Sequence, residues 1–402
     1  MCKRLLVFEL YLQLNFNTMH FQLSEEHLMI RQAARDFAQQ ECLPGVIERD
    51  EKQIFPREQV EKLADLGFMG MMVKSEYGGA GLDTISYVLA MEEISKIDAS
   101  VSVCMSVNNS LVCYGLQEFG TEAQKQQYLV PLAQGKKEGQ LYIGAFLLSE
   151  PEAGSDATSQ RTTAEDKGDY YVLNGIKNWI TNGSSADVYL VMAQTDPSKG
   201  SKGINTFIVE KNWPGVTVGA KENKMGIRGS DTHSISFQDV KVPKENRIGA
   251  DGFGFKFAMK TLAGGRIGIA AQALGIASGA YELALKYAKE RKAFGKEIMH
   301  HQAIQFKLAD MATRIEAARL LCLKSAWEKD TDLDYTLSSS MAKVFASETA
   351  MWTATEAVQI HGGYGYVKEF HVERLMRDAK ITQIYEGTSE VQRIVISRSI
   401  LQ

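Results

Sequence analysis

The hexapeptide Tyr385-Glu386-Gly387-Thr388-Ser389-Glu390 lies near the C-terminal end of the chain and places one carboxylate between two segments of helical pattern. Upstream, apolar residues recur at helical spacing from Val372 to Ile384. Downstream, Ser389 to Gln392 has the pattern of a capping box, which predicts a last helix from Val391 to Leu401. The glycine beside the carboxylate lets a ligand approach the main chain. We therefore interpret Glu386 as a candidate base, the alternative being a loop charge near a helix N-terminus.

Composition is that of an ordinary globular protein. The 402 residues are 45% hydrophobic and 23% charged, which allows two or three domains. The formal net charge is −4 with both signs interspersed, so the chain has no basic face for phosphates and we expect no nucleic-acid partner. The five cysteines form no CxxC pair and the histidines no HExxH arrangement. We therefore expect a reducing compartment and no metal.

The N-terminus briefly resembles a signal peptide. Glu9 interrupts the apolar run from Leu5 to Phe8, and no small-residue cleavage site follows. The amphipathic pattern begins only after Met19. We therefore interpret residues 1–18 as the result of a translation start assigned too far upstream. We expect residues 1–21 to be an extension outside the folded domains and the protein to be cytoplasmic.

Helical patterns fill residues 22–141. Ser24 has the position of a helix cap, and apolar residues recur at helical spacing after it. Further helices are expected from Arg57 to Leu66 and from Thr84 to Ile97. These patterns predict an N-terminal helical domain.

Short segments of strand period fill residues 142–250 and predict a small β domain of antiparallel strands. Its clearest strands are Val188–Met192, Thr206–Val209 and Ser234–Phe237. Two further segments, Phe146 to Asp156 and Lys177 to Gly183, combine hydroxyls, an aromatic residue and flexible backbone where a strand ends. This combination suits a grip on a flat polar ligand. The alternative is a pair of ordinary turns with Trp179 in the core.

Residues 251–402 return to helical patterns. Small residues crowd the segment from Gly264 to Ala280, which would let a neighbouring helix approach closely. Arg266 and Gln272 interrupt its apolar run, so we do not expect it to span a membrane. Two long periodic stretches follow: His301–Lys329 and Tyr335–Ile360. We predict a C-terminal four-helix bundle and hence an α+β protein of three domains.

The order of these domains, together with six motifs, resembles the acyl-CoA dehydrogenase family from about Phe21 to the C-terminus. The motifs are, in chain order, Glu150–Asp156, Lys177–Gly183, Asp239–Pro243, Glu290–Lys296, Gln359–Gly365 and Tyr385–Thr388. Six motifs in the family's order make the resemblance specific. It implies the acyl-CoA dehydrogenase fold.

The resemblance also implies flavin chemistry. In the family, the N5 atom of FAD takes a hydride from the β-carbon of an acyl thioester while a carboxylate, here Glu386, removes an α-proton to give the trans-2-enoyl thioester. A carboxylate can do this only if donors on the thioester oxygen stabilise the developing enolate. In the family, these donors are the backbone N–H of the base and a ribityl hydroxyl. The implied partners are acyl-CoA, electron-transferring flavoprotein and further copies of the chain, most often as a homotetramer.

Matching positions assign further residues. Around the flavin ring, the resemblance places Phe146, Leu147, Leu148, Ser149, Trp179, Ile180 and Thr181. Other FAD contacts, partly given to a second subunit, are Arg291, Phe294, Gln302, Gln359, Ile360, Gly362 and Gly363, with Thr388 and Glu390 beside the AMP part. On the substrate side it places Ser155, Gly264, Gly265, Arg266, Tyr385 and Gly387. Ser149 stands where many relatives have Thr, and Glu152 where relatives commonly have Gly, which leaves the turn before Ser155 open.

Substrate size is indicated by the segment from Thr261 to Ala270, which resembles the short-chain and short-branched-chain members. Where the isovaleryl and long-chain branches place the base, this chain has Gly265, so Glu386 has no rival. We expect butyryl- to hexanoyl-CoA or a small branched acyl-CoA, in fatty acid β-oxidation or branched-chain amino acid degradation. The alternatives are an acyl-CoA oxidase-like enzyme that uses oxygen, which the shorter chain disfavours, and a non-catalytic helical oligomer.

Overall fold

The computed structural model describes residues 22–401, so the predicted extension 1–21 and its signal-peptide interpretation lie outside the described residues. Ser24 caps α2 (Glu25–Phe37): its Oγ accepts from the backbone N of His27 at 3.1 Å, which confirms the predicted cap. The two further predicted helices are α4 (Arg57–Asp65) and α5 (Thr84–Ser95). The other elements of this part are α3 (Val46–Glu51), α6 (Ala99–Ser106), the π-helical η4 (Val107–Cys113), α7 (Tyr114–Phe119), α8 (Glu122–Gln124), α9 (Val130–Gln134), β1 (Lys136–Lys137) and β2 (Gln140–Leu141).

The central part is a sheet with strand order β10-β7-β6-β4-β5-β9-β8, and β3 pairs with β6. Its strands are β3 (Gly144–Leu147), β4 (Thr163–Asp166), β5 (Tyr170–Thr181), β6 (Val188–Gln194), β7 (Ile204–Glu210), β8 (Val216–Lys221), β9 (Thr232–Pro243) and β10 (Arg247–Ile248). The predicted antiparallel β domain is confirmed, with two parallel pairings added, that of β3 with β6 and that of β4 with β6 at Thr163 and Gln194. β3 runs parallel to β6, with Gly144 opposite Val188, because the chain returns to β6 only after the β4–β5 hairpin.

Every residue of β6 is buried, as expected for a strand that is covered on both faces. The N-terminal half of α10 (Gly254–Glu290) contacts β6 and β7, and η4 contacts β3. The end of β3 therefore lies where the sheet meets helices from both helical parts.

The C-terminal part consists of long helices. After α10 come β11 (Lys292–Ala293), β12 (Lys296–Glu297), α11 (Gln302–Asp330), α12 (Thr336–His361), α13 (His371–Ile381) and α14 (Ser389–Ile400). α10 packs against α11, α12 and α13 as well as against α5 of the N-terminal part. The predicted long stretches agree with α11 and α12 to within one residue at each end.

The small residues of α10 allow this close packing. A β-carbon at Gly275 would collide with the backbone carbonyl of Glu92 on α5, and one at Gly279 with that of Lys96. By length and composition α10 could cross a membrane, but 83% of its most apolar window is buried inside the protein. We interpret α10 as the core helix of the bundle.

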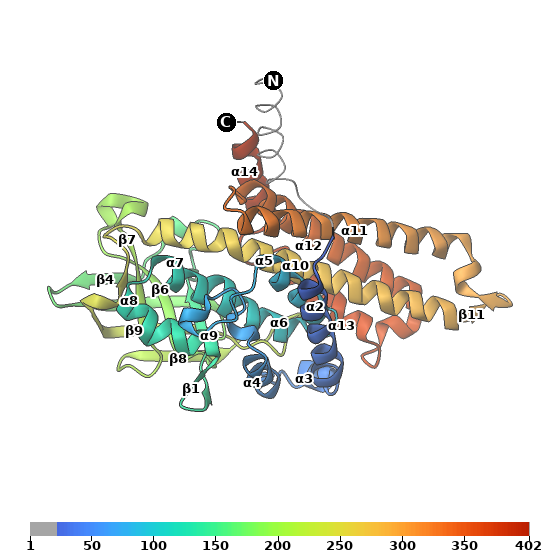
Figure 1. Ribbon diagram of the computed structural model, residues 1–402, viewed down its shortest axis with the longest axis horizontal. Helices are drawn as coiled ribbons and strands as arrows, with labels where there is room; N and C mark the ends of the chain where they lie inside the picture. Colours follow the sequence, from blue (N-terminus) through green and yellow to red (C-terminus); the bar gives the residue numbers. More distant parts are fainter. Residues whose placement is uncertain (1–21, 402) are drawn as a thin grey trace, which may run out of the picture.

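Figure 1 shows how α10 organises the molecule. The sheet lies at one end of the longest axis, and the β11–β12 hairpin lies at the other. α10 runs between them, and α11 and α12 lie along it. Residues near the start of α10 and residues just after its end are thus far apart in one chain.

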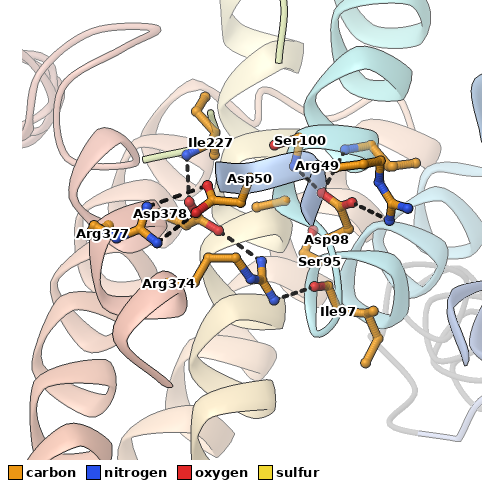
Figure 2. A network of polar contacts seen from close by, with 12 residues as sticks. Arg49, Asp50, Ser95, Ile97, Asp98, Ser100, Ile227, Arg374, Arg377 and Asp378 are labelled. Atoms are coloured by element: carbon orange, nitrogen blue, oxygen red, sulfur yellow. Dashed lines mark hydrogen bonds and ion pairs between the residues drawn. The ribbon is translucent and has the colours of Figure 1, made fainter. Parts of the chain in front are cut away.

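A buried network of charged groups joins α13 to the other two parts (Figure 2). A carboxylate oxygen of Asp378 accepts from Arg374 Nη1 at 3.0 Å, and the other accepts from the backbone N of Ile227, in the loop between β8 and β9. Arg374 Nη2 donates to the carbonyl of Ile97, between α5 and α6, at 2.7 Å. Two further pairs are Arg377 with Asp50 and Arg49 with Asp98.

Candidate active site

The segment between α13 and α14 carries the predicted base in an uncommon backbone conformation. Glu386 has φ of +52° and Gly387 has φ of +92°. A left-handed conformation at a residue other than glycine costs free energy, and it persists only where surrounding contacts enforce it. Lys343 Nζ donates to the Gly387 carbonyl at 2.7 Å, and Gln392 Nε2 donates to the same oxygen at 3.0 Å. These contacts from α12 and α14 hold the loop.

The helix after the base begins differently from the prediction. Thr388, and not Ser389, caps α14: the Thr388 Oγ1 accepts from the backbone N of Val391 at 3.2 Å. The Ser389 capping box is therefore wrong, and the helix starts two residues earlier than expected. Thr388 is the last residue with extended backbone, which is the conformation that a cap requires.

One oxygen of the Glu386 carboxylate is shielded from solvent. This Oε2 atom is buried and makes no hydrogen bond within residues 22–401. Burial raises the pKa of Glu386 to about 7, while the charges of Lys343 and Arg266 limit the rise. A buried carboxylate with a pKa near neutral, and with an oxygen left unpaired, has the properties of a general base.

α10 approaches the Glu386 carboxylate at a glycine. A β-carbon at Gly265 would collide with Glu386 Oε2 and would lie 2.8 Å from Leu111 Cδ2. A β-carbon at the neighbouring Gly264 would point in another direction and would lie 4.0 Å from the Tyr335 hydroxyl oxygen. The predicted juxtaposition of Gly265 and Glu386 is thus present in the structure.

Two other predicted substrate-side residues flank this point. Arg266 is buried and donates through Nη1 to Ser340 Oγ at 3.3 Å. The Tyr385 hydroxyl donates to the side-chain carbonyl of Gln272. Both side chains are therefore anchored to the protein and leave the space beside Gly265 to the carboxylate.

The first predicted flavin segment lies at the end of β3 and contacts the second. The backbone N of Asn178 donates to the Ser149 carbonyl at 2.8 Å. Lys177, which the sequence analysis did not single out, is fully buried, and its Nζ donates to the Leu148 carbonyl at 3.0 Å and to Glu150 Oε1 at 2.8 Å. Lys177 therefore joins β5 to the segment that follows β3.

Trp179 is 60% exposed and has φ of +62°, so the alternative that places it in the core is wrong. Its indole is available to cover a flat ligand. Three other predicted cofactor residues are buried: Leu147, Ile180 and Ile360. Their side chains pack in the core, which leaves their main chain for contacts with a ligand.

One face of α10 joins the end of β3 to Glu386. The rings of Phe146 and Phe257 stack with centroids 6.3 Å apart. Phe257, Thr261 and Gly265 follow one another at intervals of four residues and therefore share a helix face. Thr261 Oγ1 is buried and unpaired in the described part of the chain. Unpaired polar atoms on this face and on Glu386 fit a polar ligand between them.

A second group of predicted cofactor residues lies at the far end of the bundle. The Arg291 guanidinium lies 5.5 Å from the centroid of the Tyr364 ring, and the Phe294 ring contacts that of His301. Phe294 is 95% exposed. The group also includes Gln302 at the start of α11, Gln359 at the end of α12, and Gly362 and Gly363. A β-carbon at either glycine would meet no atom within 4 Å. Exposed aromatic rings beside open glycine backbone fit contact with a ligand or another chain.

One chain does not bring the two cofactor groups together. Figure 1 shows the sheet and the β11–β12 hairpin at opposite ends of the longest axis. Thr388 and Glu390 belong to the Glu386 side by their place at the start of α14. Ser155 lies exposed in the loop between β3 and β4.

The turn before Ser155 needs no glycine at position 152. Glu150 and Ala153 exchange backbone hydrogen bonds of 3.0 and 3.2 Å. Glu152 is not among the residues with positive φ, and its side chain pairs with Arg161. The departure from the family pattern at Glu152 thus leaves the turn intact.

Lys343 is a second buried lysine that the sequence analysis did not single out. Lys343 lies in the middle of α12 and is fully buried. A lysine in a helix is usually a solvated charge, but Ser339, Ala346 and Ala350 lie at helical spacing from it. These small residues mark a closely packed face, and this signal could have identified Lys343 as buried.

Comparisons with known proteins show the family of the chain. The models of the acyl-CoA dehydrogenase N-terminal, middle and C-terminal domains match residues 24–136, 145–240 and 252–401. The short-chain specific acyl-CoA dehydrogenase of Clostridium acetobutylicum is 50% identical over 384 residues, which cover 96% of this chain and 100% of that protein. The structure of butyryl-CoA dehydrogenase from Megasphaera elsdenii has a TM-score of 0.93 and 50% identity, with 96% and 100% of the two chains covered.

A further solved structure is described as the electron transferring flavoprotein of Acidaminococcus fermentans, in relation to flavin-based electron bifurcation. One of its chains has a TM-score of 0.93 and 52% identity to this chain, and the match covers 96% of this chain and 100% of that chain. Since all three domain models match and the similarity spans nearly the whole length, the chain belongs to the acyl-CoA dehydrogenase family.

Proposed function

We propose that this protein catalyses FAD-dependent α,β-dehydrogenation of a short straight or small branched acyl-CoA to the trans-2-enoyl-CoA, and passes the electrons to an electron-transferring flavoprotein. The observation that carries the proposal is the buried, unpaired Glu386 carboxylate against Gly265. Relatives named short-chain specific, and a matching chain in a structure of an electron transferring flavoprotein, support the substrate and the acceptor.

Glu386 acts as the base that takes the α-proton. With a pKa raised to about 7 by burial, its carboxylate is ionised at slightly alkaline pH and has more affinity for a proton than an ordinary glutamate. The backbone N–H of Glu386 donates to no group in the described residues. This N–H is therefore available to stabilise a developing enolate oxygen.

FAD, when bound, supplies the acceptor for the hydride from the β-carbon. The exposed indole of Trp179 and the backbone around Ser149 cover the flavin ring, with Thr181 offering a hydroxyl. Arg291 suits the pyrophosphate, because its guanidinium binds oxygen atoms in pairs. Arg291 directly precedes the β11–β12 hairpin, which lies at the opposite end of the longest axis from the sheet that contains Trp179 (Figure 1). The proposed enzyme is therefore a homo-oligomer, a tetramer by resemblance, in which one subunit completes the cofactor site of another.

The similarity to relatives named short-chain specific favours a short acyl group. Ser155, exposed on the sheet side, is assigned to the CoA portion. The proposed pathways are fatty acid β-oxidation or branched-chain amino acid degradation, in both of which short acyl-CoA substrates arise.

A cytoplasmic, reducing location is supported by the cysteines. Cys42, Cys104, Cys113 and Cys322 are buried and free. Burial raises the pKa of each thiol, which keeps it protonated and unreactive.

The test is a visible spectrum recorded during anaerobic titration with a panel of acyl-CoAs, for the parent and for Glu386→Gln. We expect a yellow protein whose flavin bleaches best with a short acyl-CoA. Glutamine keeps the size and the backbone N–H but cannot accept the proton, so Glu386→Gln should stay yellow, bind acyl-CoA and bleach about 10⁴-fold more slowly, the upper end of what a placed base contributes.

Three outcomes would contradict parts of the proposal. A colourless protein supports the non-catalytic oligomer. Peroxide release on addition of acyl-CoA in air, without electron transfer to an electron-transferring flavoprotein, supports the oxidase-like enzyme. Bleaching of Glu386→Gln within tenfold of the parent rate would show that another group is the base.

A further inference from the structure

Lys343 is a buried cation whose side chain contacts the loop that carries the candidate base. It comes from the middle of α12, and no part of its side chain is exposed. Its Nζ donates to the Gly387 carbonyl at 2.7 Å. A fully buried ammonium is costly unless it has partners, so this lysine needs an explanation beyond packing.

The loop that Lys343 contacts is under backbone strain. Glu386 has φ of +52°, and the carbonyl that accepts from Lys343 belongs to the next residue. Gln392 donates to the same carbonyl and, at 3.3 Å, to that of Glu386. One donor from α12 and one from α14 thus fix the orientation of the peptide groups on the C-terminal side of the base.

Lys343 also contributes charge at the carboxylate. The charged or titratable groups that face Glu386 are Arg266 from α10, Lys343 from α12, Tyr87 from α5 and the neighbouring Tyr385. Of the two cations, Arg266 is bonded to Ser340, whereas Lys343 is bonded to the loop of the base itself. Lys343 therefore couples the position of the loop to the ionisation of the carboxylate.

We propose that Lys343 is a positioning residue for the proposed dehydrogenation: its ammonium holds the Gly387 carbonyl so that the Glu386 carboxylate faces Gly265, and its charge stabilises the ionised form of that carboxylate. The proposal rests on the function proposed above. Lys343 touches neither the reacting carbon nor the cofactor in this account.

Two substitutions separate the two contributions. Lys343→Met removes both the donor and the charge, whereas Lys343→Gln keeps a donor for the Gly387 carbonyl and removes only the charge. The matched control is Lys96→Met, which removes a mostly buried lysine at the end of α5 that pairs with Glu93 and with Glu282 of α10. Lys96 is not among the groups that face Glu386.

The primary measurement is the pH dependence of anaerobic bleaching with butyryl-CoA, using holoenzyme. Removal of a nearby cation disfavours the carboxylate, so the acid limb should move to higher pH in both Lys343 variants, by about one pH unit or more. The maximal rate should fall further in Lys343→Met than in Lys343→Gln, because only the methionine variant loses the donor. Lys96→Met should keep the parent profile.

A second readout does not depend on turnover. The infrared C=O band of protonated Glu386, identified by its absence in Glu386→Gln, should persist to higher pH in both Lys343 variants. If the parent bleaches but the Lys343 variants share its rate, profile and infrared titration, the role of Lys343 is refuted while the proposed function stands. If the parent itself never bleaches, the proposed function is refuted, and an unshifted infrared band would refute the role of Lys343 separately.

Discussion

Glu386 is held in a conformation that few residues other than glycine adopt. A left-handed glutamate costs about 1–3 kcal/mol, and the hydrogen bonds to the following carbonyl from Lys343 and Gln392 offset that cost. The sequence indicated conformational freedom at Gly387, but the structure shows that both residues use it. The strain places the carboxylate against α10 instead of in the solvent.

Position 265 should be able to carry the base in place of position 386. Its β-carbon would point at the Glu386 carboxylate and lie 2.8 Å from Leu111 Cδ2. Gly265→Glu combined with Glu386→Gly removes the collision with the carboxylate, requires only the end of the Leu111 side chain to shift, and presents a carboxylate to the same space. We expect bleaching with butyryl-CoA about tenfold or more faster than in Glu386→Gly alone, part of the 10²- to 10⁴-fold effect of a base. The comparison requires anaerobic single-turnover rates at several pH values.

The control uses the neighbouring glycine. Gly264 faces the Tyr335 hydroxyl, so Gly264→Glu combined with Glu386→Gly should remain as slow as Glu386→Gly. Equal rates for the two double variants would show that position 265 has no special relation to the substrate.

The candidate base and its glycine neighbour could be predicted from the sequence because both belong to short motifs. The partners of Lys343 and Lys177 could not, since they lie far along the chain. The carbonyl that Lys343 binds is 44 residues away, and the Glu150 carboxylate that Lys177 binds is 27 residues away. Small neighbours at helical spacing indicate that Lys343 is buried, but only the tertiary fold decides which group its ammonium meets.

The ends of α11 and α12 were predictable to within one residue, whereas the helix ends next to the base, those of α13 and α14, were not. The apolar pattern runs from Val372 to Ile384, yet α13 ends at Ile381. Thr382 Oγ1 donates to the Ala379 carbonyl at 2.7 Å, and this contact replaces a continuation of the helix. Of the apolar residues that follow, Ile384 is exposed, whereas Tyr385 packs against the core without being helical.

The segment after α10 is expected to serve the cofactor of another subunit. Arg291→Ala removes the guanidinium that stacks on Tyr364 and that is assigned to the pyrophosphate. We expect the variant to lose FAD on dialysis and to dissociate at higher protein concentrations than the parent does, because the same surface binds FAD and contacts the other subunit. FAD content and sedimentation velocity measure the two effects.

Lys289→Ala is the matched control. Lys289 is an exposed cation in the last turn of α10, and its loss should change neither quantity. Normal FAD content in a stable Arg291→Ala monomer would show that Arg291 belongs to no shared site.

At the scale of the molecule, the network of Figure 2 connects α13 to the N-terminal helices and to the loop after β8. The three parts were expected from the sequence as successive domains. Their connection through Asp378 was not expected, because Arg374 and Asp378 have the spacing of an ordinary ion pair on a helix surface. Only the fold brings Ile97 and Ile227 to them.

Asp378→Ala should destabilise the whole protein. Asp378 is 1% exposed, and its removal leaves the buried Arg374 guanidinium without its carboxylate, which typically costs about 3–5 kcal/mol. We expect a lower midpoint of thermal unfolding, measured by calorimetry on holoenzyme at fixed concentration. Asp36→Ala, at an exposed position on α2, should leave the midpoint unchanged, and an equal midpoint for Asp378→Ala would show that the network is dispensable.

The separation along one chain between the Glu386 loop and the exposed surface around Arg291 has a genetic consequence in the proposed oligomer. Each cofactor site would then be built from two subunits, one supplying the base and the other supplying the guanidinium. A cell that carries one copy defective at Glu386 and another defective at Arg291 would assemble some sites from the sound half of each. Two alleles that are inactive alone would thus complement each other, whereas two alleles defective at the same end would not.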